Sequence, residues 1–297
     1  MTPSPTLQWI PFRWQSARLG ERDFPHAAMF LLGTLPSLDG LQGWLQFDLG
    51  APITILYEKA FSPAQQERIG EHPHRPRPAV LNGREMPVVD LSLHIGPWSI
   101  ERVAWFLGFG DDAPLPDDGR PILGTLGADW AHGHIVVLDF PNQRLSRCEA
   151  LPPAWEEQAR WAPLRRSAYG HVVLQITVDG TPRWAMFDTG SSLFHLLTDP
   201  YQWQQLTTGE VSETFPITAW GESMEVMGGP ARARFALGGQ PLAVPIIHYL
   251  EGEDRRRFLE DNDLVGILGN APFLEHILVL DFPRQRCGVV PPTARAF

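Results

Sequence analysis

The stretch DGTPRWAMFDTG at residues 179–190 repeats, without a gap, the pattern of DGLQGWLQFDLG at residues 39–50. In both copies an apolar run leads directly into an Asp-x-Gly sequence, as Asp48-Leu49-Gly50 and as Asp188-Thr189-Gly190. Each residue of the second copy follows its counterpart by 140 positions, from Asp48 to Asp188. The regular spacing indicates an internal duplication, so we expect two lobes of similar structure.

A second pair of similar segments follows each copy in the same order. Residues 121–124 and 134–144 (PILG and HIVVLDFPNQR) correspond to residues 266–269 and 276–286 (GILG and HILVLDFPRQR). The duplication predicts an N-terminal lobe over residues 1–150, an interlobe connection over 151–167 and a C-terminal lobe over 168–297. His134 and His276 are repeat equivalents at the start of a strand, which favours a structural role over metal binding.

Short apolar runs between turn residues predict strands throughout the chain. Residues 172–178 and 184–187 flank Asp179-Gly180, a pair that tolerates positive φ, and together they predict a β-hairpin. Further strands are expected at residues 87–95, 135–140, 232–237 and 277–282, and one short helix at 253–261. The sequence therefore predicts an all-β fold of two lobes.

Composition excludes several classes of function. With 297 residues, a net charge of −10 and 43% hydrophobic residues, the chain is typical of a globular protein and unsuited to non-specific nucleic-acid binding. No uncharged apolar run approaches the roughly 18 residues of a membrane span. The N-terminus lacks the pattern of a secretory signal, so we expect a cytoplasmic protein in which Cys148 and Cys287 are buried free thiols.

The repeated Asp-x-Gly sequences suggest a chemistry. An aspartate at the end of an apolar strand, followed by glycine, lies where the chain turns sharply and where another backbone can approach. Two such aspartates, related by an approximate twofold axis, can meet between the lobes, and two adjacent carboxyl groups do not both ionise readily. One then takes a proton from a water molecule while the other donates a proton to a peptide carbonyl.

These residues resemble those of the pepsin-like (clan AA) aspartic peptidases. The C-terminal half carries the resemblance in residues 187–192 (FDTGSS), 266–269 (GILG) and 280–282 (LDF). The N-terminal half repeats it more loosely in residues 47–50 (FDLG), 122–124 (ILG) and 138–140 (LDF), so the resemblance extends from about residue 30 to the C-terminus.

The resemblance implies a bilobal fold with an interlobe cleft that binds an extended peptide. It implies an aspartic endopeptidase whose catalytic residues are Asp48 and Asp188, supported by Gly50, Thr189, Gly190 and Ser191. Each Ile-Leu-Gly segment is expected to pack beneath one aspartate loop. No cofactor and no metal are implied, the partner is a peptide or unfolded protein, and one chain supplies both aspartates, so we expect a monomer.

The family also implies a β-hairpin flap over the cleft, with an aromatic residue in the first lobe. Residues 80–85, which include Asn82 and Gly83, contain no aromatic residue. Residues 219–224 of the second lobe, which include Trp220 and Gly221, have the aromatic residue and resemble a flap more closely. Either hairpin is a candidate flap.

Leu49 and Ala51 depart from the family pattern. A Thr or Ser after each catalytic aspartate joins the two loops by hydrogen bonds, and Thr189 provides only half of that arrangement because Leu49 has no hydroxyl. Ala51 likewise replaces the hydroxyl residue found at Ser191. With fewer donors near it, Asp48 should hold the proton more readily, and activity should lie nearer neutral pH.

Two other functions remain open from the residues. A pseudopeptidase that binds a peptide or protein in the cleft fits the loss of the hydroxyl at position 49. A metal enzyme that uses His72, His74, His132 and His134 is disfavoured, because residues 71–78 form a proline-broken loop without a fixed face for ligands. The first 25 residues fit either a pro-segment or an interlobe strand.

Overall fold

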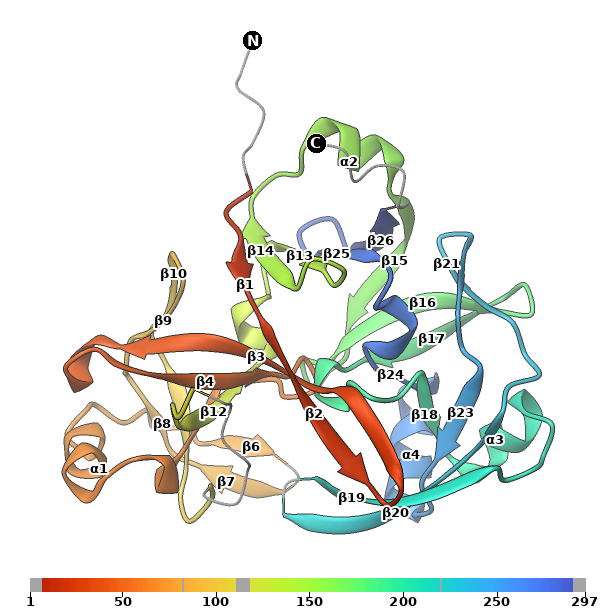
Figure 1. Ribbon diagram of the computed structural model, residues 1–297. Helices are drawn as coiled ribbons and strands as arrows, with labels where there is room; N and C mark the ends of the chain where they lie inside the picture. The colour runs from red at the N-terminus through yellow and green to blue at the C-terminus, as the bar shows by residue number, and fades with distance from the viewer. Residues whose placement is uncertain (1–6, 82, 111–117, 220, 291–297) are drawn as a thin grey trace.

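The computed structural model describes residues 7–81, 83–110, 118–219 and 221–290, and most of them lie in β-strands (Figure 1). A nine-stranded sheet belongs to the N-terminal half, and a 15-stranded sheet holds the C-terminal half and the strands between the lobes. In Figure 1 the first lobe lies on the left, the second on the right, and β13, β14, β25 and β26 above and between them. The expected all-β, two-lobed fold is confirmed.

The first lobe places its strands in the order β10-β9-β3-β4-β12-β5-β11-β8, with β2 paired to β3. The parallel neighbour of β4 is β12, which pairs Leu126 with Phe47. Helix α1 (Pro63–Gly70) begins at a capping box formed by Ser62 and Gln65. The strands are β2 (Arg13–Leu19), β3 (Arg22–Leu35), β4 (Leu41–Phe47), β5 (Ile55–Tyr57), β8 (Val88–Val89), β9 (Leu93–Ile95), β10 (Trp98–Ile100), β11 (Val103–Phe106) and β12 (Ile122–Leu126), and a separate hairpin holds β6 (Ala79–Leu81) and β7 (Arg84–Met86).

The second lobe repeats this arrangement. Its β17 is followed by the second aspartate loop, and the parallel neighbour β24 pairs Leu268 with Phe187, as Leu126 pairs with Phe47 in the first lobe. The expected hairpin is β16–β17, and its turn residues Asp179 and Gly180 have φ of 49° and 82°, as a tight hairpin turn requires. The elements are β16 (Val172–Val178), β17 (Thr181–Phe187), β18 (Leu196–Thr198), α3 (Pro200–Leu206), β19 (Glu213–Ala219), β20 (Glu222–Pro230), β21 (Phe235–Leu237), β22 (Gln240–Leu242), β23 (Ile246–Tyr249), α4 (Glu253–Asp261) and β24 (Leu264–Leu268).

The lobes are joined by antiparallel strands that pair repeat equivalents with each other. In β13 and β25, Val137 pairs with Val279, and Ile135 pairs with Asp281. Val137 and Val279 hold the same position in the two copies of the repeat, so a pseudo-twofold axis passes between them. The strands of this interlobe region are β1 (Ile10–Pro11), β13 (Ile135–Asp139), β14 (Arg144–Cys148), β25 (Ile277–Asp281) and β26 (Arg286–Val290).

Residues 151–167 connect the interlobe strands to the second lobe. They contain α2 (Pro153–Gln158) and β15 (Arg160–Arg166), which pairs with β26 through its first half and with β16 through its second half. At the N-terminus, β1 pairs with β14, so of the two roles considered for the first 25 residues the structure shows an interlobe strand. The β2–β3 hairpin then crosses in front of the junction toward β19 (Figure 1).

Two expected strands are shorter than the sequence indicates. The run 87–95 is interrupted between β8 and β9, where Asp90 N–H donates to Pro73 O instead of to a strand partner. The run 232–237 contains only β21, because the N–H groups of Arg232 and Ala233 both donate to Leu206 O at the end of α3. The helix expected at 253–261 is α4, with the same bounds.

The alignment of the Ile-Leu-Gly segments was wrong by three residues. Because Leu126 and Leu268 pair with equivalent residues of β4 and β17, the counterpart of Gly269 is Gly127, and Gly124 corresponds to Gly266. Gly124 and Gly266 share a φ near 159°, and a side chain on either would collide with the neighbouring strand. The segment beneath the first aspartate loop is therefore Thr125-Leu126-Gly127.

The core is continuous between the lobes. One cluster of buried side chains includes Phe47 and Trp130 of the first lobe, Phe187 and Phe273 of the second, and Val136 of the interlobe strands. Cys287 is buried, Cys148 is half-buried, and both are free thiols. No helix in the described part of the chain is long and apolar enough to span a membrane.

Candidate active site

Asp48 and Asp188 occupy equivalent positions at the ends of β4 and β17. The main-chain N–H of Asp48 donates to Leu126 O at 3.0 Å, and that of Asp188 donates to Leu268 O at 2.9 Å. Each carbonyl belongs to the last residue of the parallel neighbouring strand, β12 or β24. The same hydrogen bond therefore fixes the start of each aspartate loop.

The two loops meet at the junction of the lobes. A carbon atom added to Cα of Gly50 would lie 2.6 Å from Asp188 Oδ1, and one added to Gly190 would lie 2.6 Å from Asp48 Oδ1. Non-bonded carbon and oxygen atoms do not approach so closely, so only glycine leaves room for the opposite carboxyl group. The structure thus brings together Asp48, Asp188, Gly50 and Gly190.

The local donors to the two carboxyl groups differ. Asp48 Oδ1 accepts hydrogen bonds from the N–H groups of Gly50, at 2.8 Å, and Ala51, at 3.2 Å. Asp188 accepts one from Gly190 N–H at Oδ1 and one from the Ser191 hydroxyl at Oδ2, both at 2.8 Å. Ala51 cannot provide the equivalent of the Ser191 hydroxyl.

Asp48 is also the more buried carboxyl group, with 8% of its surface exposed, whereas Asp188 is half-buried. Burial raises the pKa of Asp48 well above its ordinary value, and the charge of Asp188 and the hydrogen bond between the two carboxyl groups raise it further. The N–H groups of Gly50 and Ala51 lower it, but they do not reverse the shift. The asymmetry favours a proton on Asp48.

Thr189 joins the two loops through its side chain. Its hydroxyl accepts a hydrogen bond from Leu49 N–H at 2.9 Å and donates one to Phe47 O at 2.7 Å. Leu49 is fully buried in the main core cluster and has no hydroxyl with which to return these bonds. Only one of the two reciprocal arrangements is therefore formed, and apolar packing replaces the other.

Behind the second loop, the side chain of Asn270 supports the loop through hydrogen bonds. The sequence patterns did not indicate this residue. It is fully buried, and its side-chain N–H donates to Ser192 Oγ at 2.6 Å and to Thr189 O at 3.3 Å. The one feature of the sequence that could have indicated Asn270 is its position directly after Gly269. In the first lobe, half-buried Tyr57 makes a 2.5 Å hydrogen bond with Thr125 Oγ1. Burial, and less strongly the charge of Asp48, raise the pKa of Tyr57.

Both candidate flap hairpins form. Gly83 lies at the turn between β6 and β7, and Gly221 lies at the turn between β19 and β20, each with positive φ. Asn82 and Trp220 lie outside the described residues. The second-lobe hairpin is the longer, and a carbon atom added to Gly221 would lie 3.9 Å from the ring of Phe109 in the first lobe.

The histidines that could have formed a metal site are dispersed. His134 Nδ1 lies 2.8 Å from Glu149 Oε1, His74 Nε2 lies 3.3 Å from Gly70 O, and the ring of His132 packs on Phe282. Within the described ranges, no group of three or more His, Cys, Asp or Glu side chains could hold a metal ion.

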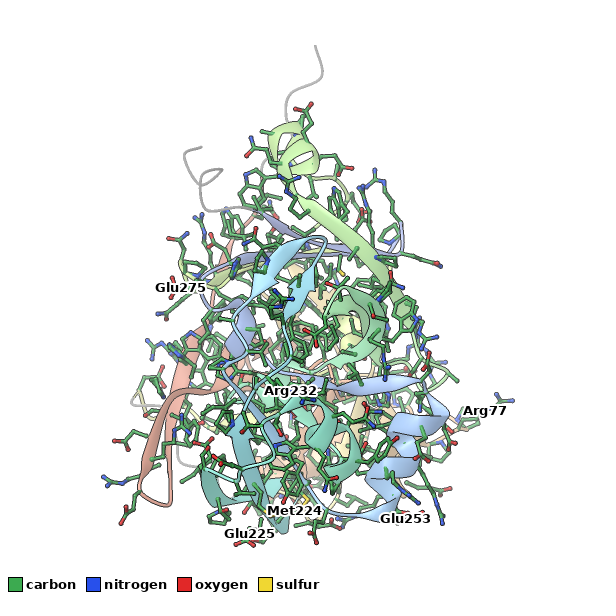
Figure 2. All side chains as sticks on the ribbon, turned by 90° about the vertical axis from the view of Figure 1, so that its right-hand side faces the viewer. Arg77, Met224, Glu225, Arg232, Glu253 and Glu275 are labelled. Atoms are coloured by element: carbon green, nitrogen blue, oxygen red, sulfur yellow. The ribbon has the colours of Figure 1, made fainter. Side chains whose placement is uncertain are left out.

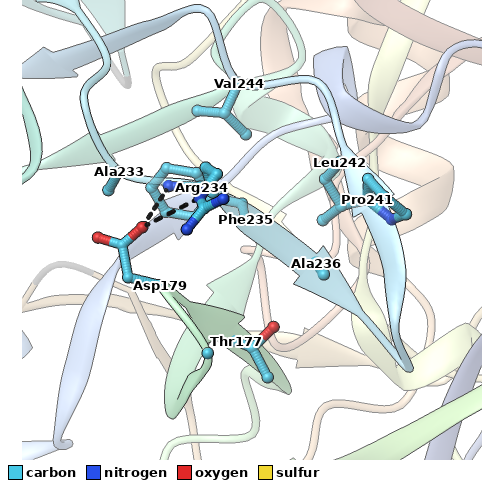
Figure 3. A pocket seen from close by; sticks show the side chains of 10 residues that line it. Thr177, Asp179, Ala233, Arg234, Phe235, Ala236, Pro241, Leu242 and Val244 are labelled. Carbon is cyan, nitrogen blue, oxygen red and sulfur yellow. Dashed lines mark hydrogen bonds and ion pairs between the residues drawn. The ribbon is translucent and has the colours of Figure 1, made fainter.

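A pocket of about 370 Å³ lies elsewhere on the second lobe, between β16 and the β21–β22 hairpin (Figure 3). At one side Arg234 N–H donates to Asp179 Oδ1 at 3.0 Å. Asp179 and Asp188 flank opposite ends of β17, whose seven residues span about 20 Å. This pocket is therefore separate from the aspartate pair.

Two similar lobes, each with an Asp-x-Gly loop at the end of a buried strand, define the bilobal fold of the pepsin-like aspartic proteinases, and solved structures bear this out. The aspartic proteinase of Irpex lacteus superposes with a TM-score of 0.58 at 11% identity, over 98% of this chain and 99% of that chain. Basic 7S globulin of soybean gives 0.50 at 12% identity, with the same two coverages.

No protein-family model and no curated protein sequence matches the chain. At identities of 11% and 12%, the structural likeness shows the fold alone. One of the two similar structures is named as a proteinase and the other as a globulin, so function has to be argued from the residues of this chain.

The Thr189 hydroxyl yields a first prediction. Thr189→Val leaves the buried Leu49 N–H and Phe47 C=O without partners, so it should lower the free energy of unfolding by about 2–4 kcal/mol. Thr189→Ser keeps the hydroxyl and should cost about 1 kcal/mol or less. Urea unfolding of the three proteins measures the difference, and equal losses in both variants would contradict the assigned role.

The raised pKa of Asp48 yields a second prediction. The folded protein holds this proton at pH values where the unfolded chain has released it, so stability is lost as pH rises from about the ordinary value of 3.8 through the raised value. Asp48→Asn mimics the protonated acid. Its melting temperature should exceed that of the original protein at pH 7, by about 2 °C for each pH unit by which the pKa is raised.

Thermal melting between pH 4 and pH 8 tests this, with the exposed Asp23 as the control position. The difference between Asp48→Asn and the original protein should grow with pH and be smallest near pH 4. Asp23→Asn should show no such trend. An Asp48→Asn variant that is less stable at pH 7 than the original protein would show that the carboxylate is accommodated in its charged form.

Proposed function

We propose that this protein is an aspartic endopeptidase in which Asp48 and Asp188 form the catalytic dyad. The observation that carries the proposal is the mutual approach of the two loops, in which each glycine faces the carboxyl group of the other lobe. Two carboxyl groups held together in an incompletely buried site, with one favoured in its protonated form, are suited to general acid and base catalysis.

The roles follow from the different surroundings of the two groups. Asp188, with hydrogen bonds from Gly190 and Ser191, acts as the carboxylate that takes a proton from a bound water molecule. Asp48, protonated, donates its proton to the carbonyl oxygen of the scissile peptide bond. The hydroxide attacks the carbonyl carbon to give a tetrahedral diol. The diol breaks down when the amine nitrogen receives the proton held on Asp188 and one diol hydroxyl returns a proton to Asp48, which restores the starting state of the dyad.

The substrate in this proposal is a peptide or an unfolded protein that lies extended between the lobes. Gly50, Thr189, Gly190 and Ser191 position the dyad rather than react, and neither a metal ion nor a cofactor takes part. Because one chain provides both aspartates, we propose that the protein works as a monomer. The second-lobe hairpin, which reaches Phe109 across the junction at Gly221, is the better candidate for the flap.

A peptide-binding protein without turnover is the second candidate, and the buried Leu49 favours it because it removes half of the hydrogen bonding between the loops. Cleavage of a denatured protein mixture between pH 3 and 7.5 separates the two candidates. A peptidase should lose at least about 1,000-fold of its rate in Asp188→Asn and should be inhibited by a pepstatin-type compound. Binding without cleavage at any pH, in a folded sample, would favour the second candidate.

The pH profile carries a further prediction. Activity should fall at high pH when the shared proton is lost, and the raised pKa of Asp48 places this fall nearer neutral pH than an isolated aspartic acid would. Ala51→Ser adds a hydroxyl where Ser191 has one, which favours ionised Asp48. The high-pH limb of kcat/KM should then move down by up to about one pH unit. A limb that stays in place or rises would contradict the assigned protonation.

A further inference from the structure

A half-buried arginine lies on the Asp188 side of the junction. Arg255 is on α4, three residues before Phe258, whose ring lies 5.5 Å from the ring of His171 at an angle of 82°. Burial lowers the pKa of both Arg255 and His171, and the Asp188 carboxylate opposes that effect on each of them. Val173 of β16 pairs with Met186 of β17, so His171 and Asp188 lie side by side just beyond the paired ends of these strands. Because Phe258 packs on His171, α4 brings Arg255 to the Asp188 side of the dyad.

Arg255 differs from the other half-buried arginines in the described part of the chain. There are seven such arginines, and Arg255 alone donates no hydrogen bond to a described residue and forms no ion pair with one within 4 Å. A guanidinium has five N–H donors, and no nitrogen of Arg255 is among the fully buried side-chain atoms that lack a partner, so its donors remain accessible to a ligand. The other six donate as follows: Arg68 to Asp39, Arg120 to Asp118, Arg144 to Asp139, Arg147 to Trp130 O, Arg165 to Asn262 O and Arg286 to Asp281.

The turn before β16 carries apolar surface at the junction of the lobes. The ring of Tyr169 lies 6.3 Å from that of His171 and is 69% exposed, which is unusual for a large side chain. Beside it, a carbon atom added to Gly170 would lie 3.2 Å from Cβ of Pro52, so this turn reaches the first lobe. His171 thus lies between an exposed aromatic ring and the helix that carries Arg255, an arrangement suited to a peptide residue with an apolar stem and an acidic end.

Glu253, two residues before Arg255 on the same helix, does not pair with it. Glu253 accepts hydrogen bonds from Arg256 and Arg257 instead. Figure 2 shows Glu253 at the lower edge of the second lobe, along the same edge as Met224 and Glu225 of β20.

We propose that Arg255 is a specificity-determining residue that binds a carboxylate of the peptide substrate on the Asp188 side of the dyad. The proposal rests on the peptidase function argued above and names its substrate class: peptides with an acidic group within a few residues of the scissile bond. A guanidinium binds a carboxylate through two parallel N–H···O bonds, which gives both affinity and orientation. The carboxylate belongs either to an Asp or Glu side chain or to the C-terminus of the peptide.

Matched peptides test the proposal. In a cleaved peptide, each position within three residues of the scissile bond is set to Glu or to Gln, and each peptide is made with a free C-terminal carboxylate or an amide. The full chain should prefer the carboxylate at one position by about tenfold to a hundredfold in kcat/KM. Glu against Gln identifies a side-chain carboxylate, and free acid against amide identifies a C-terminal one.

Substitutions assign the preference to Arg255. Arg255→Gln should abolish it: kcat/KM for the carboxylate peptide should fall, mainly through a higher KM, to the value that the same variant shows for the matched peptide without the carboxylate. Arg255→Lys should retain part of the preference, because it keeps the positive charge but loses the two parallel N–H donors of the guanidinium group. Arg256→Gln removes the same charge from an exposed position of the same helix and should leave the preference unchanged.

Two results would overturn the proposal while the peptidase function stands. One is equal kcat/KM for all the matched peptides with the original protein. The other is an Arg255→Gln variant that slows every peptide by the same factor, because Arg255 would then act on Asp188 and not on the substrate. If the protein cleaves nothing, the peptidase function fails, and the binding of labelled Glu and Gln peptides then decides whether Arg255 selects a carboxylate.

Discussion

The contact of two carboxyl groups across a pseudo-twofold axis is the constraint on which the rest of this structure depends. Glycine at positions 50 and 190 makes it possible, because any side chain there would occupy the place of the opposite carboxyl group. The loops are held from behind by β12 and β24 and from the side by the Thr189 hydroxyl. Between the lobes, the pairing of Val137 with Val279 fixes the axis that relates the two loops.

The backbone is nearly symmetric, and the chemistry is not. Equivalent residues begin and end equivalent strands, but the first loop has Leu49 and Ala51 where the second has Thr189 and Ser191. Leu49 replaces a hydrogen-bonding hydroxyl with a buried apolar side chain, and Ala51 lacks the hydroxyl that would donate to a carboxyl group. Two adjacent acids in identical surroundings would share their proton equally, whereas these surroundings favour one proton position.

The sequence predicted the fold well, because duplication adds information that a single pattern lacks. Repeat spacing located both aspartate loops, and Asp179-Gly180 located a hairpin. The predicted register of the segment beneath the first loop was wrong because Ile122-Leu123-Gly124 has the same three residues as Ile267-Leu268-Gly269. The true register is set by the pairing of Leu126 with Phe47. The local amino-acid sequence does not reveal that long-range contact.

The surroundings of the aspartates were predictable only in part. The missing donors near Asp48 could be inferred from Leu49 and Ala51, but its greater burial depends on packing from distant segments. Tyr57 and Asn270 reach the loops through tertiary contacts that no local pattern indicates. Arg255 is an ordinary residue of a charged helix in sequence, and only the placement of α4 beside His171 and Asp188 distinguishes it.

That Asp48 holds the shared proton of the dyad is tested most directly by a pH titration of the side-chain carboxyl carbons of Asp48 and Asp188 by 13C NMR. Single Asp→Asn variants assign the two signals. The Asp48 signal should be that of a protonated acid well above pH 4, and the pair should release its two protons in separate steps. Both signals at the ionised position by pH 5, in a single step, would contradict this assignment.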